Sequence, residues 1–339
     1  MEVPEGFEKF YPIGCLLLLL QTIYGLKQVA FAFWVQLLKA LCDTEFDHSK
    51  ADPCLYFRWT KQGLTLWISW VDDCMSVGKR ELVLDVKKGM MDRFNCDKVG
   101  ELTEFVGCKL ERDAKQLKIM QLVLMQSFAD KFYLPEGWAP TTPAEPGLVL
   151  MKARDDKAIN GTAQLMYWSG VGKLIHMMKW SRPDVLNVVQ DLMWHMSKAT
   201  LCHVKAMKQV MTYVTAMADC GLTLEPNVKW DGSKEFEFEV TGYSDSDFAK
   251  DPATCKSVSG WAVFLNGTPI LMRSKMQDCT TLPVTEAELV AAMACTQDIL
   301  FSMRLLESIG LKVQKLMVLR VDNKGAKDLE NNWSVGGRT

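Results

Sequence analysis

The segment GYSDSD at residues 242–247 follows a run in which Phe236, Phe238 and Val240 alternate with polar residues. Strict alternation of apolar and polar side chains is typical of a β-strand with one buried face. We therefore expect a strand that leads directly into a pair of carboxylates, the first of which is Asp245. Strand ends are where α/β sheets gather functional side chains.

The elements downstream of this segment alternate in kind. In order, we expect a strand over 257–265, an Asn-Gly hairpin turn at 266–267, a strand over 269–275, a helix over 285–309, a strand over 316–321 and a helix over 324–330. The long helix is amphipathic and is stopped by Gly310. The order of three strands, helix, strand and helix predicts an α/β (α+β) mixed sheet.

Three carboxylates occupy special places in that order. Asp245 follows the first strand, Glu288 lies in the first turn of the long helix, and Asp322 ends the fourth strand. Clustered carboxylates repel one another, and hard oxygen ligands suit magnesium or manganese. Two such ions about 4 Å apart can clamp the attacking water and the leaving oxygen of a phosphodiester.

Each carboxylate also has a purely structural interpretation. Asp245 and Asp247 are compatible with an ordinary turn pair. Asp322, followed by asparagine, is compatible with a cap for the last helix, and the segment TEAE at 285–288 fits a capping box. Spacing alone leaves both interpretations open.

Four motifs in this region resemble the ribonuclease H domain of copia-type LTR retrotransposon polyproteins. They are GYSDSD at 242–247, KSVSG at 256–260, TEAE at 285–288 and VDN at 321–323. The resemblance implies a ribonuclease H fold, magnesium, and cleavage of the RNA strand in an RNA–DNA hybrid. It maps the metal-binding carboxylates onto Asp245, Glu288 and Asp322. The family's fourth carboxylate is expected just beyond GGRT at 336–339.

The resemblance continues upstream into a reverse transcriptase. The matching motifs are YGLKQ at 24–28, DPCLY at 52–56, WVDD at 70–73, GEL at 100–102, FVG at 105–107 and RPD at 182–184. Together they indicate a reverse-transcriptase palm remnant over 1–134, a helical thumb or connection over 135–234, and a ribonuclease H-like domain over 235–339.

The WVDD motif fits a hairpin tip. Residues 64–71 alternate as a strand and 74–77 can return, which places Asp72 and Asp73 at the turn. Adjacent aspartates on a strand point to opposite faces, so only one binds metal tightly, and the family implies Asp72. A plain Asp-Asp turn is the alternative. The family's first catalytic aspartate lies upstream of the segment that Met1 begins, so we expect an incomplete polymerase site.

Nucleic-acid contacts are expected from polar and basic residues near both sites. Near the ribonuclease H motifs these are Lys256, Arg273 and Lys275, and in the GLKQ motif they are Lys27 and Gln28. The expected partners are an RNA–DNA hybrid, a template–primer and other parts of the polyprotein. The expected cofactor is Mg²⁺ or Mn²⁺ in a two-metal arrangement.

Composition limits the remaining possibilities. The formal net charge is −2, so any nucleic-acid site is local. The 11 cysteines form no Cys-x-x-Cys pair, which argues against zinc and for reduced thiols inside the cell, in the cytoplasm (a virus-like particle) or the nucleus. The apolar stretch 10–26, about 17 residues, is short for a membrane span and predicts a buried strand or helix.

These observations predict a fragment with RNA-directed DNA polymerase and ribonuclease H ancestry. Two rival interpretations stay open. One is a non-catalytic or domesticated nucleic-acid-binding relic, and the other is a self-sufficient ribonuclease H-like endonuclease with a structural N-terminal half.

Overall fold

The computed structural model describes residues 2–18, 28–71, 73–96, 100–135, 137–152 and 157–330, without the side chains of residues 329 and 330. The chain forms two compact units, Met1–Lys98 and Val99–Thr339. Helix accounts for 39% of the chain and strand for 23%, so the predicted α+β class is confirmed. The three family regions, bounded at residues 134 and 234, remain a prediction.

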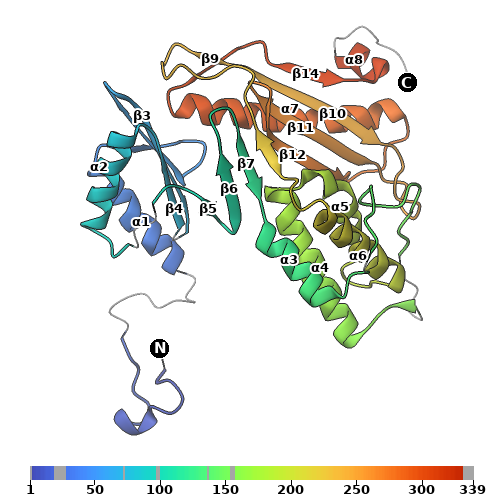
Figure 1. Ribbon diagram of the computed structural model, residues 1–339, viewed down its shortest axis with the longest axis horizontal. Helices are drawn as coiled ribbons and strands as arrows, with labels where there is room; N and C mark the ends of the chain where they lie inside the picture. The colour runs from blue at the N-terminus through green and yellow to red at the C-terminus, as the bar shows by residue number, and fades with distance from the viewer. Residues whose placement is uncertain are drawn as a thin grey trace. The chain divides into compact units, whose positions relative to one another are not determined.

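The first unit is an antiparallel sheet with two helices on one face (Figure 1). Its elements are η1 (Glu8–Phe10), α1 (Val29–Cys42), β1 (Asp47–His48), β2 (Leu55–Thr60), β3 (Gly63–Trp70), β4 (Asp73–Val77) and α2 (Arg80–Met91). The sheet order is β1-β2-β3-β4, which confirms the hairpin expected from WVDD.

The side chains of β3 point alternately to the two faces of the sheet, and α1 and α2 cover one of these faces. Trp67 is paired with Tyr56 of β2, and both side chains pack against Leu41 of α1 and Val86 of α2. The second face of β3 is less completely covered, because Leu64 is buried there while Ile68 is only partly buried. The helices therefore bury one face of the sheet.

The expectation for the apolar stretch 10–26 is wrong where the structure describes it. Ile13, Leu16 and Leu18 are exposed, and an isolated bridge between Glu2 and Leu16 is the local pairing. Residues 19–27 lie outside the described residues. Apolar composition alone does not bury a segment, because burial also needs a complementary partner surface.

The second unit begins with a small sheet and a helical bundle. The elements are β5 (Glu104–Phe105), β6 (Cys108–Arg112), β7 (Leu117–Met120), α3 (Leu122–Phe132), α4 (Gly161–Trp180), η3 (Pro183–Val185), α5 (Leu186–Trp194), α6 (Leu201–Ala216) and β8 (Leu222–Leu224). The helices α4, α5 and α6 follow one another along the chain, and the 3₁₀ turn η3 directly precedes α5.

Methionine side chains fill the core of this bundle. Met207 and Met211 of α6 pack with Tyr167 and Leu174 of α4, and all four are fully or almost fully buried. A Cβ at Gly170 would lie 2.4 Å from Met207 Sδ, so a residue without a side chain allows α4 and α6 to approach closely. Flexible methionine side chains fill the irregular space between these helices.

Arg182, just after the end of α4, links this helix to α6. It is 2% exposed, and its guanidinium donates to Asp184 and to the carbonyls of Val214 and Met217 at the C-terminal end of α6. The Tyr213 hydroxyl also donates to Asp184, at 3.0 Å. Arg182 is thus a buried brace between the end of α4 and the end of α6.

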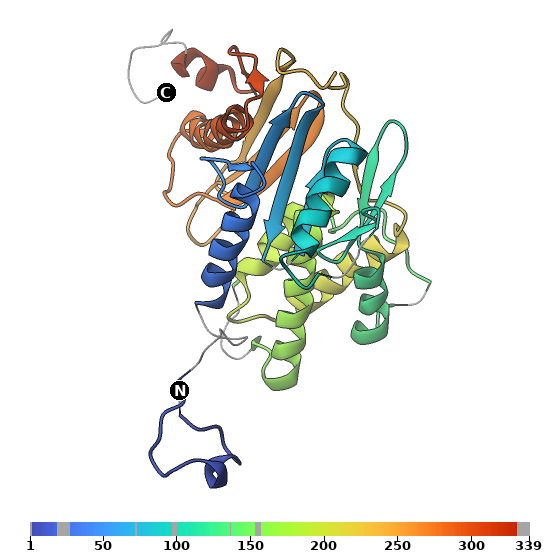
Figure 2. The same ribbon diagram turned by 90° about the vertical axis from the view of Figure 1, so that its left-hand side faces the viewer.

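The last part of the second unit is a mixed sheet with one long helix along a face (Figures 1 and 2). Its elements are β9 (Glu237–Phe238), β10 (Val240–Asp247), β11 (Val258–Leu265), β12 (Thr268–Met276), α7 (Val284–Ser308), β13 (Lys312–Val313), β14 (Val318–Val321) and α8 (Lys324–Glu330). The sheet order is β12-β11-β10-β14, in which β10 and β14 run parallel.

The elements expected over this region are therefore present. The turn residues Asn266 and Gly267 have φ values of 46° and 79°, as the expected Asn-Gly hairpin requires. Gly310 has a φ of 81° and follows α7, as expected of a helix stop. The short pairing of β13 with β9 was not expected.

α7 is apolar because it is the core helix of this sheet. A Cβ at Gly242 of β10 would lie 2.5 Å from Ile299 and 2.7 Å from Cys295, so the helix and the strand are in close contact. Among the described residues, α7 is also long and apolar enough to cross a membrane. The helix packs on β10 and β11, and 28% of its most apolar window is buried.

Candidate metal centre

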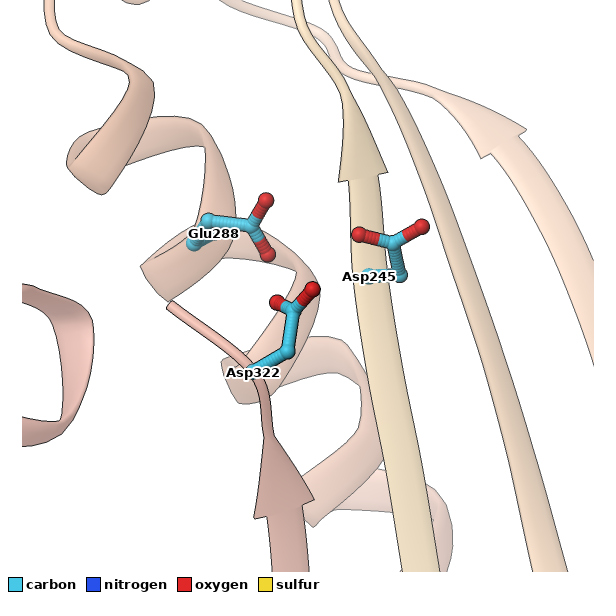
Figure 3. Close-up of side chains that lie close together, drawn as sticks. All are labelled: Asp245, Glu288 and Asp322. Carbon is cyan, nitrogen blue, oxygen red and sulfur yellow. The ribbon is translucent and has the colours of Figure 1, made fainter. Parts of the chain in front are cut away.

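Asp245, Glu288 and Asp322 meet at one end of the mixed sheet (Figure 3). One carboxylate oxygen from each lies within 4.8 Å of the others. The register explains the first pair, because Ser244 of β10 is the partner of Val321 of β14 and the next residue on each strand is an aspartate. α7 crosses β10 and brings Glu288 to the same point.

The two oxygens of Glu288 have different surroundings. The side chain is 4% exposed, and Oε1 accepts a hydrogen bond of 2.8 Å from the Ser246 hydroxyl. Oε2 is buried and has no hydrogen-bond partner among the described residues. An unpaired, buried carboxylate oxygen is costly unless a cation or a proton satisfies it.

The negative charge of the three carboxylates also favours a bound cation. Burial raises the pKa of Glu288 above its ordinary value of 4.5, and repulsion from Asp245 and Asp322 adds to it, against the opposing hydrogen bond from Ser246. The carboxylates of Asp245 and Asp322 are exposed to approach from solvent. Three carboxylates, one of which has a buried oxygen without a hydrogen-bond partner among the described residues, fit a divalent cation such as Mg²⁺ or Mn²⁺.

The cap expected at 322–323 for the last helix is present and is made by Asn323, whereas the turn expected at Asp245 and the capping box expected at Glu288 are not. At the start of α7, Glu286 and not Glu288 reaches back, because its Oε2 accepts from the Leu282 N–H at 3.4 Å. At the start of α8, Asn323 Oδ1 accepts from the Ala326 N–H at 2.9 Å, so asparagine supplies the cap. Asp245 lies within β10 and not in a turn.

The basic residues expected to contact nucleic acid already have acidic or carbonyl partners. Lys256 donates to the carbonyl of Asp278 at 2.8 Å, and Lys275 pairs with the carboxylate of the same residue at 3.3 Å. Arg273 lies 3.9 Å from Asp298 of α7. Lys256 and Lys275 thus sit together at the loop that precedes α7, whereas Arg273 lies against the helix.

A crevice of about 430 Å³ opens beside Asp245 within the second unit. Strand residues such as Gly260 and Ser274 form one wall, while Asp184 and Asn187, from η3 and α5, form part of the other. The sequence did not indicate the last two, because only tertiary packing brings η3 and α5 to this sheet.

The hairpin of the first unit brings the ends of β3 and β4 together. Trp70, the last residue of β3, pairs with Asp73, the first residue of β4. Val71 has a φ of 56°, which a β-branched residue adopts only under strain, and such strain concentrates at functional turns. Asp72 lies outside the described residues, while Asp73 is exposed at the start of β4.

The expected contacts in the GLKQ motif are similarly limited. Lys27 lies outside the described residues. Gln28 is exposed and precedes the first residue of α1, where its carbonyl accepts from the Ala32 N–H at 2.9 Å. Its side chain is therefore available at a helix start.

Comparison with known proteins gives one family match and several relatives. The family described as reverse transcriptase (RNA-dependent DNA polymerase) matches residues 1–146. The chain is 28% identical, over 347 aligned positions, to the retrovirus-related Pol polyprotein from transposon TNT 1-94 of Nicotiana tabacum, covering 100% of this chain and 25% of that protein. It is 25% identical over 328 positions to the corresponding polyprotein from transposon RE1 of Arabidopsis thaliana, covering 96% and 22%.

A third relative is much shorter than the polyproteins. The chain is 32% identical over 132 positions to the secreted RxLR effector protein 161 of Plasmopara viticola, covering 39% of this chain and 87% of that protein. The chain spans about a quarter of the length of the Pol polyproteins that it matches. No solved structure matches the chain significantly.

Proposed function

The chain belongs to the Pol polyprotein family of copia-type LTR retrotransposons, and from this premise we propose that its C-terminal sheet cleaves the RNA strand of RNA–DNA hybrids. The coarser role, that of a retrotransposon polymerase-related protein, follows from the family itself. The observation that carries the proposal is the buried, unpaired Oε2 of Glu288 within reach of Asp245 and Asp322.

The proposal assigns roles to the three carboxylates and to the side chains around them. Asp245, Glu288 and Asp322 would hold Mg²⁺ or Mn²⁺, and Ser246 orients the Glu288 carboxylate through its hydroxyl. Bound cations would neutralise charge on the attacking and leaving oxygens of the phosphodiester. The crevice beside Asp245, which Arg273 helps to line, would admit the backbone, and Lys256 and Lys275 would attract phosphates.

The first unit is assigned to the polymerase part of the same polyprotein. We propose that Asp72 and Asp73 belong to its nucleotidyl-transfer site and that Lys27 and Gln28 contact the template–primer. The support is the family match over residues 1–146 together with the pairing of Trp70 with Asp73 and the positive φ of Val71. Other segments of the polyprotein are proposed partners.

The test is cleavage of an RNA–DNA hybrid by the full chain in manganese and in magnesium. Glu288→Gln should abolish cleavage, because a neutral amide is a poor ligand for a hard cation. Glu286→Gln is the matched control, since Glu286 lies in the same helical turn and its side chain caps the backbone of Leu282. It should cleave as the wild type does.

Loss of cleavage in both variants would mean that the substitutions destabilise α7 and do not act on the metal centre itself. Unchanged cleavage in Glu288→Gln would refute the assignment. Single-stranded RNA is the substrate control, because the proposal requires the hybrid to be cut in preference.

A second candidate function is a domesticated, non-catalytic product that binds nucleic acid. The observation that favours it is the effector protein of Plasmopara viticola, 87% of which matches part of this chain. A short protein therefore exists most of which is similar to part of this chain. Hybrid binding that survives in Glu288→Gln, together with no cleavage by the wild type, would support this candidate.

We also propose an intracellular location, in the cytoplasm or the nucleus. All 11 cysteines are free thiols, and most are exposed. Exposed thiols are stable in a reducing compartment and are oxidised outside the cell. Fractionation of cells that express the chain tests this location.

A further inference from the structure

One buried side chain ties the first turn of α7 to the sheet. Gln277 follows β12 and is 4% exposed, and its backbone N–H donates to the carbonyl of Ser257 at 2.8 Å. Its side-chain Nε2 donates to Ser259 Oγ and to the carbonyl of Ala287, at 2.9 Å each. A carbonyl can only accept, so the amide nitrogen must face Ala287.

These hydrogen bonds close a ring around Glu288. Ser259 of β11 is the direct cross-strand partner of Ser246 of β10, and Ser246 donates to Glu288 Oε1 at 2.8 Å. Ala287, held by Gln277, is the residue immediately before Glu288. Ser246 of β10 therefore holds the carboxylate of Glu288, while Gln277, at the end of β12, holds the backbone of the residue before it.

We infer that Gln277 is a positioning residue for the metal centre. It holds the first turn of α7 at the place where the carboxylate of Glu288 comes within 4.8 Å of those of Asp245 and Asp322. The inference rests on the proposed function, because it concerns the ligands of the proposed cations. Gln277 acts through Ala287 and Ser259.

The physical reason is the cost of assembling three carboxylates. Glu288 is buried beside two like charges, so without constraint its lowest-energy response is to turn away from them. A hydrogen bond to the backbone of the preceding residue limits that movement. Groups that orient metal ligands in this way typically change metal affinity by about 10- to 100-fold when removed.

The experiment measures Mn²⁺ affinity of the full chain by electron paramagnetic resonance of free Mn²⁺. Gln277→Met keeps the length and the bulk of the side chain and removes both donors. It should weaken Mn²⁺ binding by about 10-fold or more. This readout is independent of cleavage.

A buried glutamine elsewhere provides the matched control. Gln164 of α4 is 9% exposed, and its Nε2 also donates to a backbone carbonyl, that of Met196 at 2.8 Å, within the helical bundle. Gln164→Met should lower the melting temperature yet leave Mn²⁺ affinity within about two-fold of the wild type, because it lies outside the ring.

Gln277→Asn is the second variant, to be used if Gln277→Met does not fold. Asparagine is one methylene shorter and cannot span Ser259 and Ala287 together, so the same loss of affinity is expected. Wild-type affinity in a folded Gln277 variant would overturn the inference. If Glu288→Gln binds Mn²⁺ as well as the wild type does, the metal centre itself fails and the inference falls with it.

Discussion

His203 of α6 is held neutral by its surroundings, and its replacement by glutamine should flatten the dependence of stability on pH. The ring is 1% exposed, and its Nδ1 accepts the Thr200 N–H at 2.9 Å as part of a capping box. The remaining hydrogen of the neutral ring therefore lies on Nε2, which has no partner among the described residues. Protonation must occur at Nδ1 and would break the cap.

The neighbours of His203 reinforce this effect. Burial, and then the charge of His195, whose ring centroid is 4.2 Å away, lower the pKa of His203 from 6.5 to about 4. Tyr167 contacts the ring edge-on, and Asp251 and the carbonyl of Leu150 face His195. The pKa of His195 is also lowered, chiefly by burial.

The difference in the pKa of His203 between the folded and unfolded chain determines how stability changes with pH. The unfolded chain takes up a proton near pH 6.5 and the folded chain only near pH 4, so stability is complete above 6.5 and is lost as the pH falls toward 4. The full gap corresponds to about 3 kcal/mol, of which about 2 kcal/mol is lost between pH ~7 and ~5. His203→Gln keeps a residue suited to this capping position, and removes the titration.

The assay is urea unfolding of the full chain at about pH 7 and about pH 5, read by pulsed hydrogen exchange in α4 and α6. The wild type should lose about 2 kcal/mol more than His203→Gln between these pH values. The exposed His48 provides a control, since His48→Gln should behave as the wild type. An equal loss in the wild type and in His203→Gln would refute the reasoning.

Two further substitutions test the packing described above. Gly242→Ala places a Cβ 2.5 Å from Ile299 and 2.7 Å from Cys295, and should destabilise the mixed sheet by about 1–3 kcal/mol in urea unfolding. The control Gly260→Ala should not, because its Cβ has no atom closer than 3.9 Å, and equal effects of the two substitutions would contradict the close contact of α7 with β10. Arg182→Lys cannot reproduce the hydrogen bonds to Asp184, Val214 and Met217 together, and should cost about 2–4 kcal/mol in thermal or urea unfolding; a change below about 0.5 kcal/mol would show that the brace is dispensable.

The sequence predicted the part of the fold that local patterns encode. The alternation before Asp245, the Asn266-Gly267 turn and the stop at Gly310 are local signals, and all three elements are present. The gathering of Asp245, Glu288 and Asp322 followed from their places at strand ends and a helix start. The parallel pairing of β10 with β14 then sets the two aspartates side by side.

Features that depend on distant partners were not predictable in the same way. β8 pairs with β7 across about a hundred residues, and its three residues are too few to show a period. Asp184 and Asn187 reach the crevice beside Asp245 only because η3 and α5 pack near the sheet. Gln277 gave no signal, because a glutamine after a strand is ordinary until its two acceptors are known.

The central claim is that Asp245, Glu288 and Asp322 form one cation site. Anomalous X-ray scattering from crystals of the full chain soaked in Mn²⁺ tests it most directly. We predict a peak bonded to oxygens of all three carboxylates, at about 2.2 Å, with Glu288 Oε2 among the ligands. Manganese that binds elsewhere, while Oε2 of Glu288 stays unbound, would contradict the account.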